Sequence, residues 1–288
     1  MSNSVVVVGV DGSPGSLHAL RWAAPLARSG HRLVAVNAWE YPFVTLVPAS
    51  FGGSAAPPVA AMQTAAEIAL ADGVDEVATE FGVGIEQEVR EGSPAAALLA
   101  VAEEHDARLV VVGNRGGGGI RQVVLGSVSR RVVTHAERPV VVVPDEAPID
   151  YAGPVVVGID GSPNSIEALR WALTLSDDPV HAVHVWRIPT ALAIGPGDEQ
   201  FGALEEVHAQ ALADAVAAAA GDASRRVEEH LLYGDARDLL VSTDLNPSLI
   251  VVGAGGHSAL PAVLTGSVTT HLISHSPTAV AVVPLVED

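Results

Sequence analysis

The sequence predicts two α/β domains in tandem, each built on a buried parallel sheet with helices on both faces. Three observations support this prediction. The same motifs recur in the same order in both halves, short β-branched runs alternate with helical patterns, and the runs are mostly valine, isoleucine and leucine. Strands that are apolar throughout are typical of sheets buried on both faces. Alternation with helices indicates right-handed βαβ units and hence parallel strands.

The clearest organisational feature is an internal duplication. The segment 5–14, Val-Val-Val-Val-Gly-Val-Asp-Gly-Ser-Pro, returns at 155–163, and Ala-Leu-Arg-Trp-Ala at 19–23 returns at 168–172. Val-Val-Val-Gly at 110–113 returns as Ile-Val-Val-Gly at 250–253. A length of 288 residues suits two domains of about 150 residues each. The boundary is expected in the Pro- and Asp-containing stretch 145–153, which gives domains 1–147 and 148–288.

The predicted elements follow the apolar runs and the helix signals. In the first half we expect strands at 5–10, 32–38, 85–90, 108–112 and 139–144, and helices at 14–29, 59–82, 93–105 and 127–136. In the second half strands are expected near 154–159, 180–186, 226–232, 248–252 and 278–284. Ser13-Pro14 and Ser162-Pro163 are typical of an N-cap followed by proline at the first helical position.

Composition excludes several classes of function. The formal net charge is −19, which disfavours binding to the phosphate backbone of nucleic acid. Cysteine is absent, which removes disulfides, thiol nucleophiles and thiolate metal sites. Lysine is absent too, so there is no Walker A loop and no Schiff-base lysine. No apolar run reaches the ~18 residues of a membrane span, and the start of the chain lacks the basic residues of a signal peptide. We therefore expect a cytoplasmic protein that binds neither membrane nor nucleic acid.

Two features at the carboxyl ends of predicted strands point to a ligand site in each half. Asp11 and Asp160 directly follow the first strand of their halves. After the fourth strand comes Gly-x-x-Gly, nine residues and Gly-Ser, at 113–127 and again at 253–267. Open α/β sheets bind ligands at these strand ends, where the direction of winding switches. Glycine after a strand and Gly-Ser before a helix are each common structural features, but two copies at identical spacing favour a site.

The spacing suits a nucleotide. Gly113 lets the chain leave the strand without a Cβ, and Gly116 allows positive φ and close approach of backbone N–H groups to a ligand. Gly126-Ser127 opens a helix whose free N–H groups and dipole attract phosphate. The Asp11 carboxylate is placed to accept the ribose hydroxyls.

With these motifs the chain resembles a tandem universal stress protein. The resemblance covers nearly the whole chain and rests on the pattern Gly-x-x-Gly-(nine residues)-Gly-Ser/Thr, which is present twice. It implies an open, Rossmann-like, five-stranded parallel sheet of order 3-2-1-4-5 in each domain. It also implies that the protein binds ATP with a divalent cation such as Mg²⁺ and takes part in a stress response.

The resemblance also assigns roles to individual residues. Asp11 and Asp160 would bind the ribose, and Val10 and Ile159 directly precede them in the site. Ala38 and Val185 would contact adenine. Val112 and Val252 would flank the base. The phosphates would be lined by Gly113, Gly116, Gly126, Ser127, Val128 and Ser129 in the first half, and by Gly253, Gly256, Gly266, Ser267, Val268 and Thr269 in the second. No His, Asp or Glu group shows metal-ligand spacing, so Mg²⁺ is expected to bind through the phosphates alone.

We interpret the chain as a regulator that binds ATP and acts through conformation or a protein partner, and not as an enzyme. It lacks His-x-Gly-His, Ser-Gly-Gly-x-Asp-Ser and Gly-x-Ser-x-Gly, the motifs of related ATP-cleaving enzymes and of hydrolases. A slow ATPase, another adenine-nucleotide-dependent enzyme and a ligand-free interaction module remain the alternatives.

Two further expectations concern the halves. The last strands, within 139–144 and 277–284, would otherwise be apolar sheet edges, so we expect them to cover each other in an intramolecular pseudo-dimer. A homodimer of the whole chain is a further expectation.

The first phosphate loop carries Arg115 and Arg121, whereas the second contains Ala254 and Pro261 and no arginine. We therefore expect the first site to bind the triphosphate more tightly.

Overall fold

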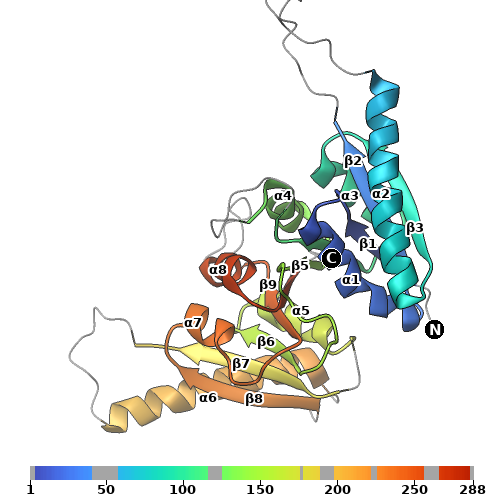
Figure 1. The fold of residues 1–288 in the computed structure, drawn as a ribbon. Helices are drawn as coiled ribbons and strands as arrows, with labels where there is room; N and C mark the ends of the chain where they lie inside the picture. The colour runs from blue at the N-terminus through green and yellow to red at the C-terminus, as the bar shows by residue number, and fades with distance from the viewer. Residues whose placement is uncertain are drawn as a thin grey trace, which may run out of the picture. The chain divides into compact units, whose positions relative to one another are not determined.

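The computed structural model describes residues 4–40, 58–115, 125–175, 178–188, 198–221, 226–255 and 266–285. The chain divides into two compact units, Met1–His135 and Ala136–Asp288. Each unit is an α/β layer structure, which confirms the predicted fold class (Figure 1). No helix among the described residues has both the length and the apolar character that crossing a bilayer requires.

The first unit is a parallel sheet of order β3-β2-β1-β4. Its helices alternate with the strands along the chain, as predicted, and the observed bounds differ from the expected ones by about one residue at most ends. The elements are β1 (Val5–Gly9), α1 (Pro14–Arg28), β2 (Arg32–Trp39), α2 (Val59–Phe81), β3 (Ile85–Glu91), α3 (Pro94–Glu104), β4 (Leu109–Gly113) and α4 (Ser127–His135).

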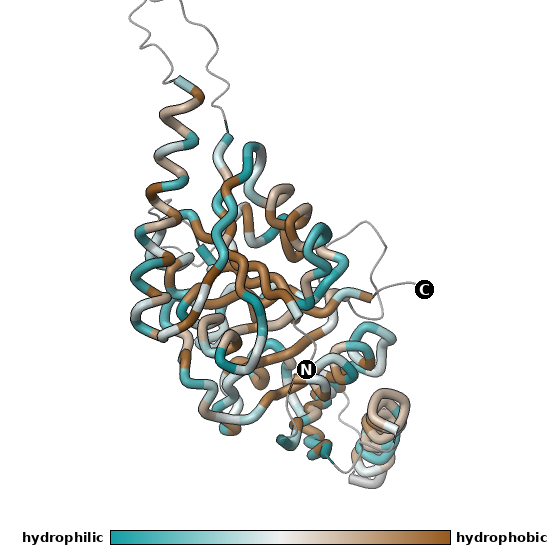
Figure 2. The backbone as a smooth tube through the Cα atoms, turned by 90° about the vertical axis from the view of Figure 1, so that its right-hand side faces the viewer, coloured by the Kyte–Doolittle hydropathy of each residue, from teal (hydrophilic) through white to brown (hydrophobic). Residues whose placement is uncertain are grey.

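Helices cover both faces of this sheet. A Cβ added at Gly9 would meet the Leu98 side chain of α3 at 3.0 Å, whereas the next residue, Val10, lies beside Gly73 of α2. Successive residues of a strand point to opposite faces, so α3 and α2 lie on opposite sides. The valines of β1 and β4 are buried, and hydrophobic colour is concentrated on the strands in Figure 2.

The second unit has the strand order β5-β10-β9-β6-β7-β8. All neighbours are parallel except β5 and β10. Read from β8 to β10, the strands of the second repeat show the expected 3-2-1-4-5 order, and the order β3-β2-β1-β4 of the first unit agrees with it. The elements are β5 (Val140–Val143), β6 (Val155–Ile159), α5 (Pro163–Ala172), β7 (Val180–Trp186), α6 (Asp198–Ala220), β8 (Val227–Tyr233), α7 (Ala236–Val241), β9 (Leu249–Gly253), α8 (Ser267–His275) and β10 (Ala279–Val283).

The last strands of the two sequence repeats pair with each other inside the second unit, as expected. Strand β5 belongs to the first repeat by sequence, yet it runs antiparallel to β10, with Val142 opposite Val280 and Val140 opposite Val282. All four valines of β5 are buried. An unpaired β10 would present a row of free backbone N–H and C=O groups, so β5 covers an edge that the second repeat leaves open.

This pairing makes a prediction about fragments. We expect residues 148–288, which lack β5, to self-associate through the exposed β10 edge. Sedimentation velocity over a range of concentrations measures this. A fragment that stayed strictly monomeric at high concentration would show that the β10 edge does not need a covering strand.

Candidate functional site

The first aspartate of the predicted site is fixed by its own loop. Asp11 follows β1, and Gly12 turns the chain with a φ of 78°, in the left-handed region. The backbone N–H of Ser13 donates to Asp11 Oδ1 at 2.9 Å, and the Asp11 N–H donates to Ser16 Oγ at 3.2 Å. Burial acts to raise the pKa of Asp11, but the hydrogen bonds from Ser13 and Ser16 outweigh it and hold the pKa below its ordinary value. The side chain nevertheless reaches solvent, so an ionised carboxylate is presented at the strand end.

The second repeat builds the same loop. Gly161 has a φ of 82°. Ser162 donates to Asp160 Oδ1 twice, from its backbone N–H at 2.9 Å and from its hydroxyl at 2.5 Å. Ser13 and Ser162 are also the N-caps of α1 and α5, where their side chains accept from the N–H groups of Ser16 and Ser165. The predicted caps are confirmed, and each cap also orients a site aspartate.

The end of β4 lies against the start of α1. A Cβ added at Gly113 would stand 2.8 Å from the carbonyl oxygen of Gly15, and one at Gly253 would stand 2.7 Å from the backbone of Asn164. Contacts this short are not tolerated, so both strand-end glycines are required by close approach to the first helix of their repeat. Because β1 pairs in parallel with β4, and β6 with β9, these glycines lie at the same sheet edge as the aspartates.

The start of α4 is tied to the end of β4. The Gly126 N–H donates to the Asn114 carbonyl at 2.8 Å, and the buried Ser129 hydroxyl donates to the Gly113 carbonyl at 2.6 Å. In the second repeat Thr269 Oγ1 donates to the Gly253 carbonyl at 3.0 Å. The hydroxyls of Ser129 and Thr269 thus point into the protein, and only their backbone N–H groups remain for a ligand.

Three backbone N–H groups at the start of α4 lie outside the helical hydrogen-bond ladder. The ladder begins with Arg130, whose N–H donates to the Gly126 carbonyl, and in α8 with Thr270, which donates to Gly266. The N–H groups of residues 127–129 and 267–269 precede these bonds. Ser127 and Ser267 are exposed, and Val128 and Val268 are half-buried. Each helix start therefore offers N–H groups and a positive dipole end toward the edge that carries the aspartate.

The remaining predicted residues divide into three groups. Val10, Val112, Ile159 and Val252 are buried at the strand ends. Ala38 and Val185 are half-buried near the ends of β2 and β7. Gly116, Gly256 and Arg121 lie outside the described residues, and Arg115 is the last described residue before the first loop.

The strand ends of the two repeats differ in ways that sequence reasoning missed. Asn114 Oδ1 is buried and accepts no hydrogen bond within the described part of the chain, and its counterpart by position is Ala254. In the second repeat His184 Nδ1 lies 2.7 Å from the Ile159 carbonyl oxygen, and its Nε2 lies 2.9 Å from His208 Nδ1 of α6. The corresponding residue of β2, counted back from the tryptophan that ends each strand, is Asn37.

An aromatic cluster extends from this histidine pair. Trp186 stacks on His208 at a centroid distance of 4.8 Å and also contacts Phe201 and Tyr233. Burial, and then the neighbouring His184, lower the pKa of His208. Trp186, Phe201 and Tyr233 are 15 to 47 residues apart in the sequence, so no local motif predicts the cluster.

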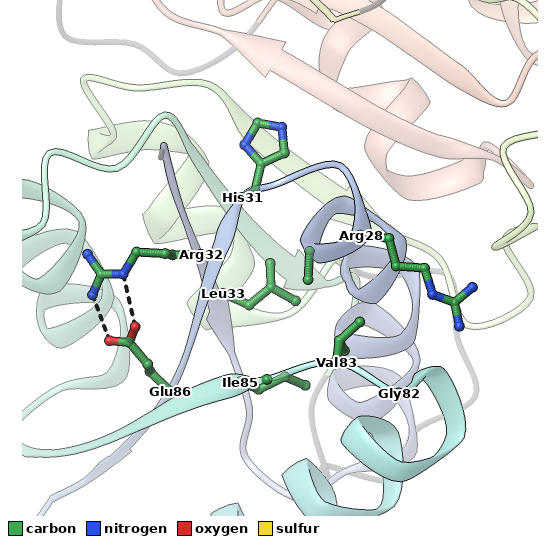
Figure 3. A pocket seen from close by; sticks show the side chains of 10 residues that line it. Arg28, His31, Arg32, Leu33, Gly82, Val83, Ile85 and Glu86 are labelled. Atoms are coloured by element: carbon green, nitrogen blue, oxygen red, sulfur yellow. Dashed lines mark hydrogen bonds and ion pairs between the residues drawn. The ribbon is translucent and has the colours of Figure 1, made fainter. Parts of the chain in front are cut away.

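A separate hollow lies at the opposite, amino-terminal edge of the first sheet (Figure 3). It is lined by the starts of β2 and β3 and by the turn at Gly82. Its polar side chains are already paired, because Arg32 forms two hydrogen bonds with Glu86, Arg28 donates to the Phe81 carbonyl, and His31 bonds Ser4. The loops with the aspartates and glycines therefore remain the candidate site.

Comparison with known proteins identifies the family of both repeats. Residues 3–144 and 152–284 match the Universal stress protein family. A universal stress protein of Mycolicibacterium smegmatis is 32% identical over 292 residues, which cover 96% of each chain. One from Mycobacterium tuberculosis is 29% identical and covers 96% of this chain and 95% of its own.

Solved structures share the fold over the full length. A universal stress protein from Archaeoglobus fulgidus superposes with a TM-score of 0.67 at 19% identity and covers 99% of both chains. A putative universal stress protein from Pseudomonas aeruginosa gives a TM-score of 0.61 at 14% identity, over 98% of this chain and 93% of that one.

The close approach at Gly113 yields a stability prediction. The substitution Gly113→Ala places a Cβ against the Gly15 backbone, and we expect it to destabilise the protein by about 1–3 kcal/mol, as overpacking does. The control is Gly202→Ala within α6, where a Cβ meets nothing within 4 Å and alanine should stabilise the helix by roughly 0.5–1 kcal/mol. Denaturant midpoints measure both effects, and equal midpoints for the two variants would contradict the packing argument.

Proposed function

Because the chain belongs to the universal stress protein family, as a member with two domains in tandem, we propose that it is a regulator of the stress response that binds ATP. The proposal rests mainly on one observation. In each repeat an aspartate, a strand-end glycine and the start of a helix meet at one sheet edge. These groups complement a ribose and its phosphates, and the protein would act through conformation or a partner.

The ribose end of the site relies on Asp11 and Asp160. Serine N–H groups hold one oxygen, Oδ1, of each carboxylate, and the side chains are exposed. A carboxylate has about four acceptor sites on its two oxygens. It therefore has the capacity to accept the two ribose hydroxyls as well.

The phosphate end relies on backbone groups. A chain with a net charge of −19 repels an anionic ligand at long range, so short-range donors must provide the attraction. The N–H groups at the starts of α4 and α8 and the helix dipoles supply them. In our proposal Mg²⁺ is held by the phosphates at this position, and it neutralises part of their charge.

The same geometry favours binding over turnover. An efficient general base has a pKa near the working pH, whereas hydrogen bonds lower the pKa of Asp11, which makes it a weak base toward water. Ser129 and Thr269 donate their hydroxyl protons to backbone carbonyls and are not activated as nucleophiles. The alternative is a slow ATPase or another adenine-nucleotide-dependent enzyme. Steady hydrolysis faster than about one per second would favour that alternative.

The test of the proposal is binding of Mg-ATP to the purified full-length chain by titration calorimetry. We expect Asp11→Asn to weaken ATP binding at the first site by about ten- to hundredfold, because hydrogen bonds to a charged group are lost. The matched control is Asp72→Asn on an exposed position of α2, which removes the same charge away from the site. No heat with the wild type, or equal affinities for the double variant Asp11→Asn/Asp160→Asn and the control, would refute ATP binding at these sites.

We further propose that the first repeat binds the triphosphate more tightly. Arg115 follows the end of β4, whereas the corresponding residue after Gly253 is Gly255, whose carbonyl accepts from the Asn164 side chain. An arginine adds charge-assisted contacts to phosphate. We therefore expect Arg115→Ala to weaken ATP binding about tenfold or more and to leave adenosine binding unchanged. Parallel titrations with the two ligands measure this, and an equal loss for both would assign Arg115 a structural role instead.

A further inference from the structure

Three metal-ligating side chains converge on the outer part of the second sheet. His181 lies on β7, and Glu228 and His230 lie on the neighbouring strand β8. His181 Nδ1 is 2.8 Å from His230 Nε2 and 3.7 Å from a carboxylate oxygen of Glu228. One ligand atom from each residue lies within 4.8 Å of the other two. The three atoms therefore face a common point.

The sheet register explains the convergence. Strands β7 and β8 are parallel, with His181 opposite Glu228 and Val183 opposite His230. Residues two apart on a strand share a face, so all three side chains project from the same side of the sheet. His184 lies three positions beyond His181 and therefore points to the other face, toward α6. The two histidine pairs of this unit are thus separate.

The cluster is accessible and its imidazoles are suited to binding. The Glu228 side chain is 58% exposed and the His181 side chain 15% exposed, so an ion can enter from solvent. Burial lowers the pKa of His230, as does the neighbouring His181, against an opposing effect of Glu228. The neutral imidazole, which is the form that binds metals, is thereby favoured at His230.

The first repeat carries no such cluster at the equivalent positions. Counted from the start of β3 and the end of β2, its residues are Val34, Glu86 and Glu88. Arg32 holds the Glu86 carboxylate, while Arg90 and His105 hold that of Glu88. The strand framework is therefore the same without these histidines, and a metal is not needed for this part of the fold to form.

We propose that His181, Glu228 and His230 bind one divalent transition-metal cation of the Zn²⁺ class. Two imidazoles and one carboxylate are a known three-ligand set for zinc, with water in the open position. At a Zn–N distance of about 2.0–2.1 Å, tetrahedral geometry separates two ligand nitrogens by about 3.3 Å. The present separation of 2.8 Å thus needs to widen by about half an ångström, which side-chain rotation provides.

Metal binding replaces the hydrogen bond between the two histidines. In the metal-free protein one of the facing nitrogens carries a proton and the other accepts it. To ligate, both must present lone pairs, so the proton moves to the other nitrogen of its own imidazole through solvent, and no net proton is released. The bound ion would join the edge strand β8 to β7. This proposal is independent of nucleotide binding, because His181 and Glu228 lie at the starts of β7 and β8, whereas Asp160 and Gly253 lie at the carboxyl ends of their strands.

The experiment is a calorimetric titration of the metal-stripped full-length protein with Zn²⁺, together with the visible spectrum of its Co²⁺ form. We expect one strong equivalent of Zn²⁺ per chain. We expect His181→Val, which installs the residue found at the equivalent position of β2, to weaken this binding by at least about tenfold. Glu228→Gln on the exposed carboxylate should weaken it as well, and it serves as the second variant if His181→Val alters folding.

Other histidine pairs provide the controls. His271 and His275 stack at 4.2 Å on α8, and His208 pairs with His184. We expect His275→Gln and His208→Gln to retain the strong equivalent and the Co²⁺ spectrum of the wild type. Absence of a strong equivalent in the wild type would overturn the proposal. Its retention in both His181→Val and Glu228→Gln, or its loss in a control variant, would do so too, because the ion would then bind elsewhere.

Discussion

The parallel pairing of the first and fourth strands of each repeat is the constraint on which the rest of the site depends. Val7 lies opposite Val110 in the first repeat, and Val156 opposite Ile250 in the second. Since parallel neighbours end at the same edge, loops about a hundred residues apart in the chain come together there. The pairing itself is maintained by valines that are buried on both faces and contribute to the free energy of folding through the apolar area they remove from water. The apolar core thus determines where the polar groups of the site meet.

At this sheet edge, hydrogen bonds from serine side chains fix the loops, and the backbone N–H groups are the donors available to a ligand. Ser13 caps a helix and orients Asp11, while Ser129 ties the start of α4 to the end of β4. A serine in a Gly-Ser-Val-Ser motif suggests a phosphate contact, but the hydroxyl of Ser129 is satisfied inside the protein. What such a motif provides is a helix start whose N–H groups are fixed in direction. Fixed donors are useful to an anionic ligand because they need no reorganisation on binding.

Most of the fold was predictable from the sequence, since the apolar runs and the caps are local signals. The strand bounds, the N-caps at Ser13 and Ser162 and the pairing of the last strands follow from such signals. The sequence also predicts that Asp11 and Gly113 lie at one edge of the sheet, because the glycine motif, which is weak evidence alone, occurs twice with the same spacing. The histidine groups were not predictable. His184 and His208 are 24 residues apart, and His181 and His230 are 49 apart. They meet only through sheet register and helix packing, which no local spacing encodes.

Duplication explains why the two repeats keep one framework and differ in side chains. Close backbone contacts constrain Gly113 and Gly253, and left-handed φ angles constrain Gly12 and Gly161. Such positions cannot change in either copy without cost to the fold. Side chains at the strand ends carry no such constraint. Asn37 in one repeat and His184 in the other each fit the same buried position, but an amide and an imidazole offer different hydrogen-bonding groups. A tandem chain can therefore keep one site as it was and change the ligand chemistry of the other, because a single intact copy suffices for the original ligand.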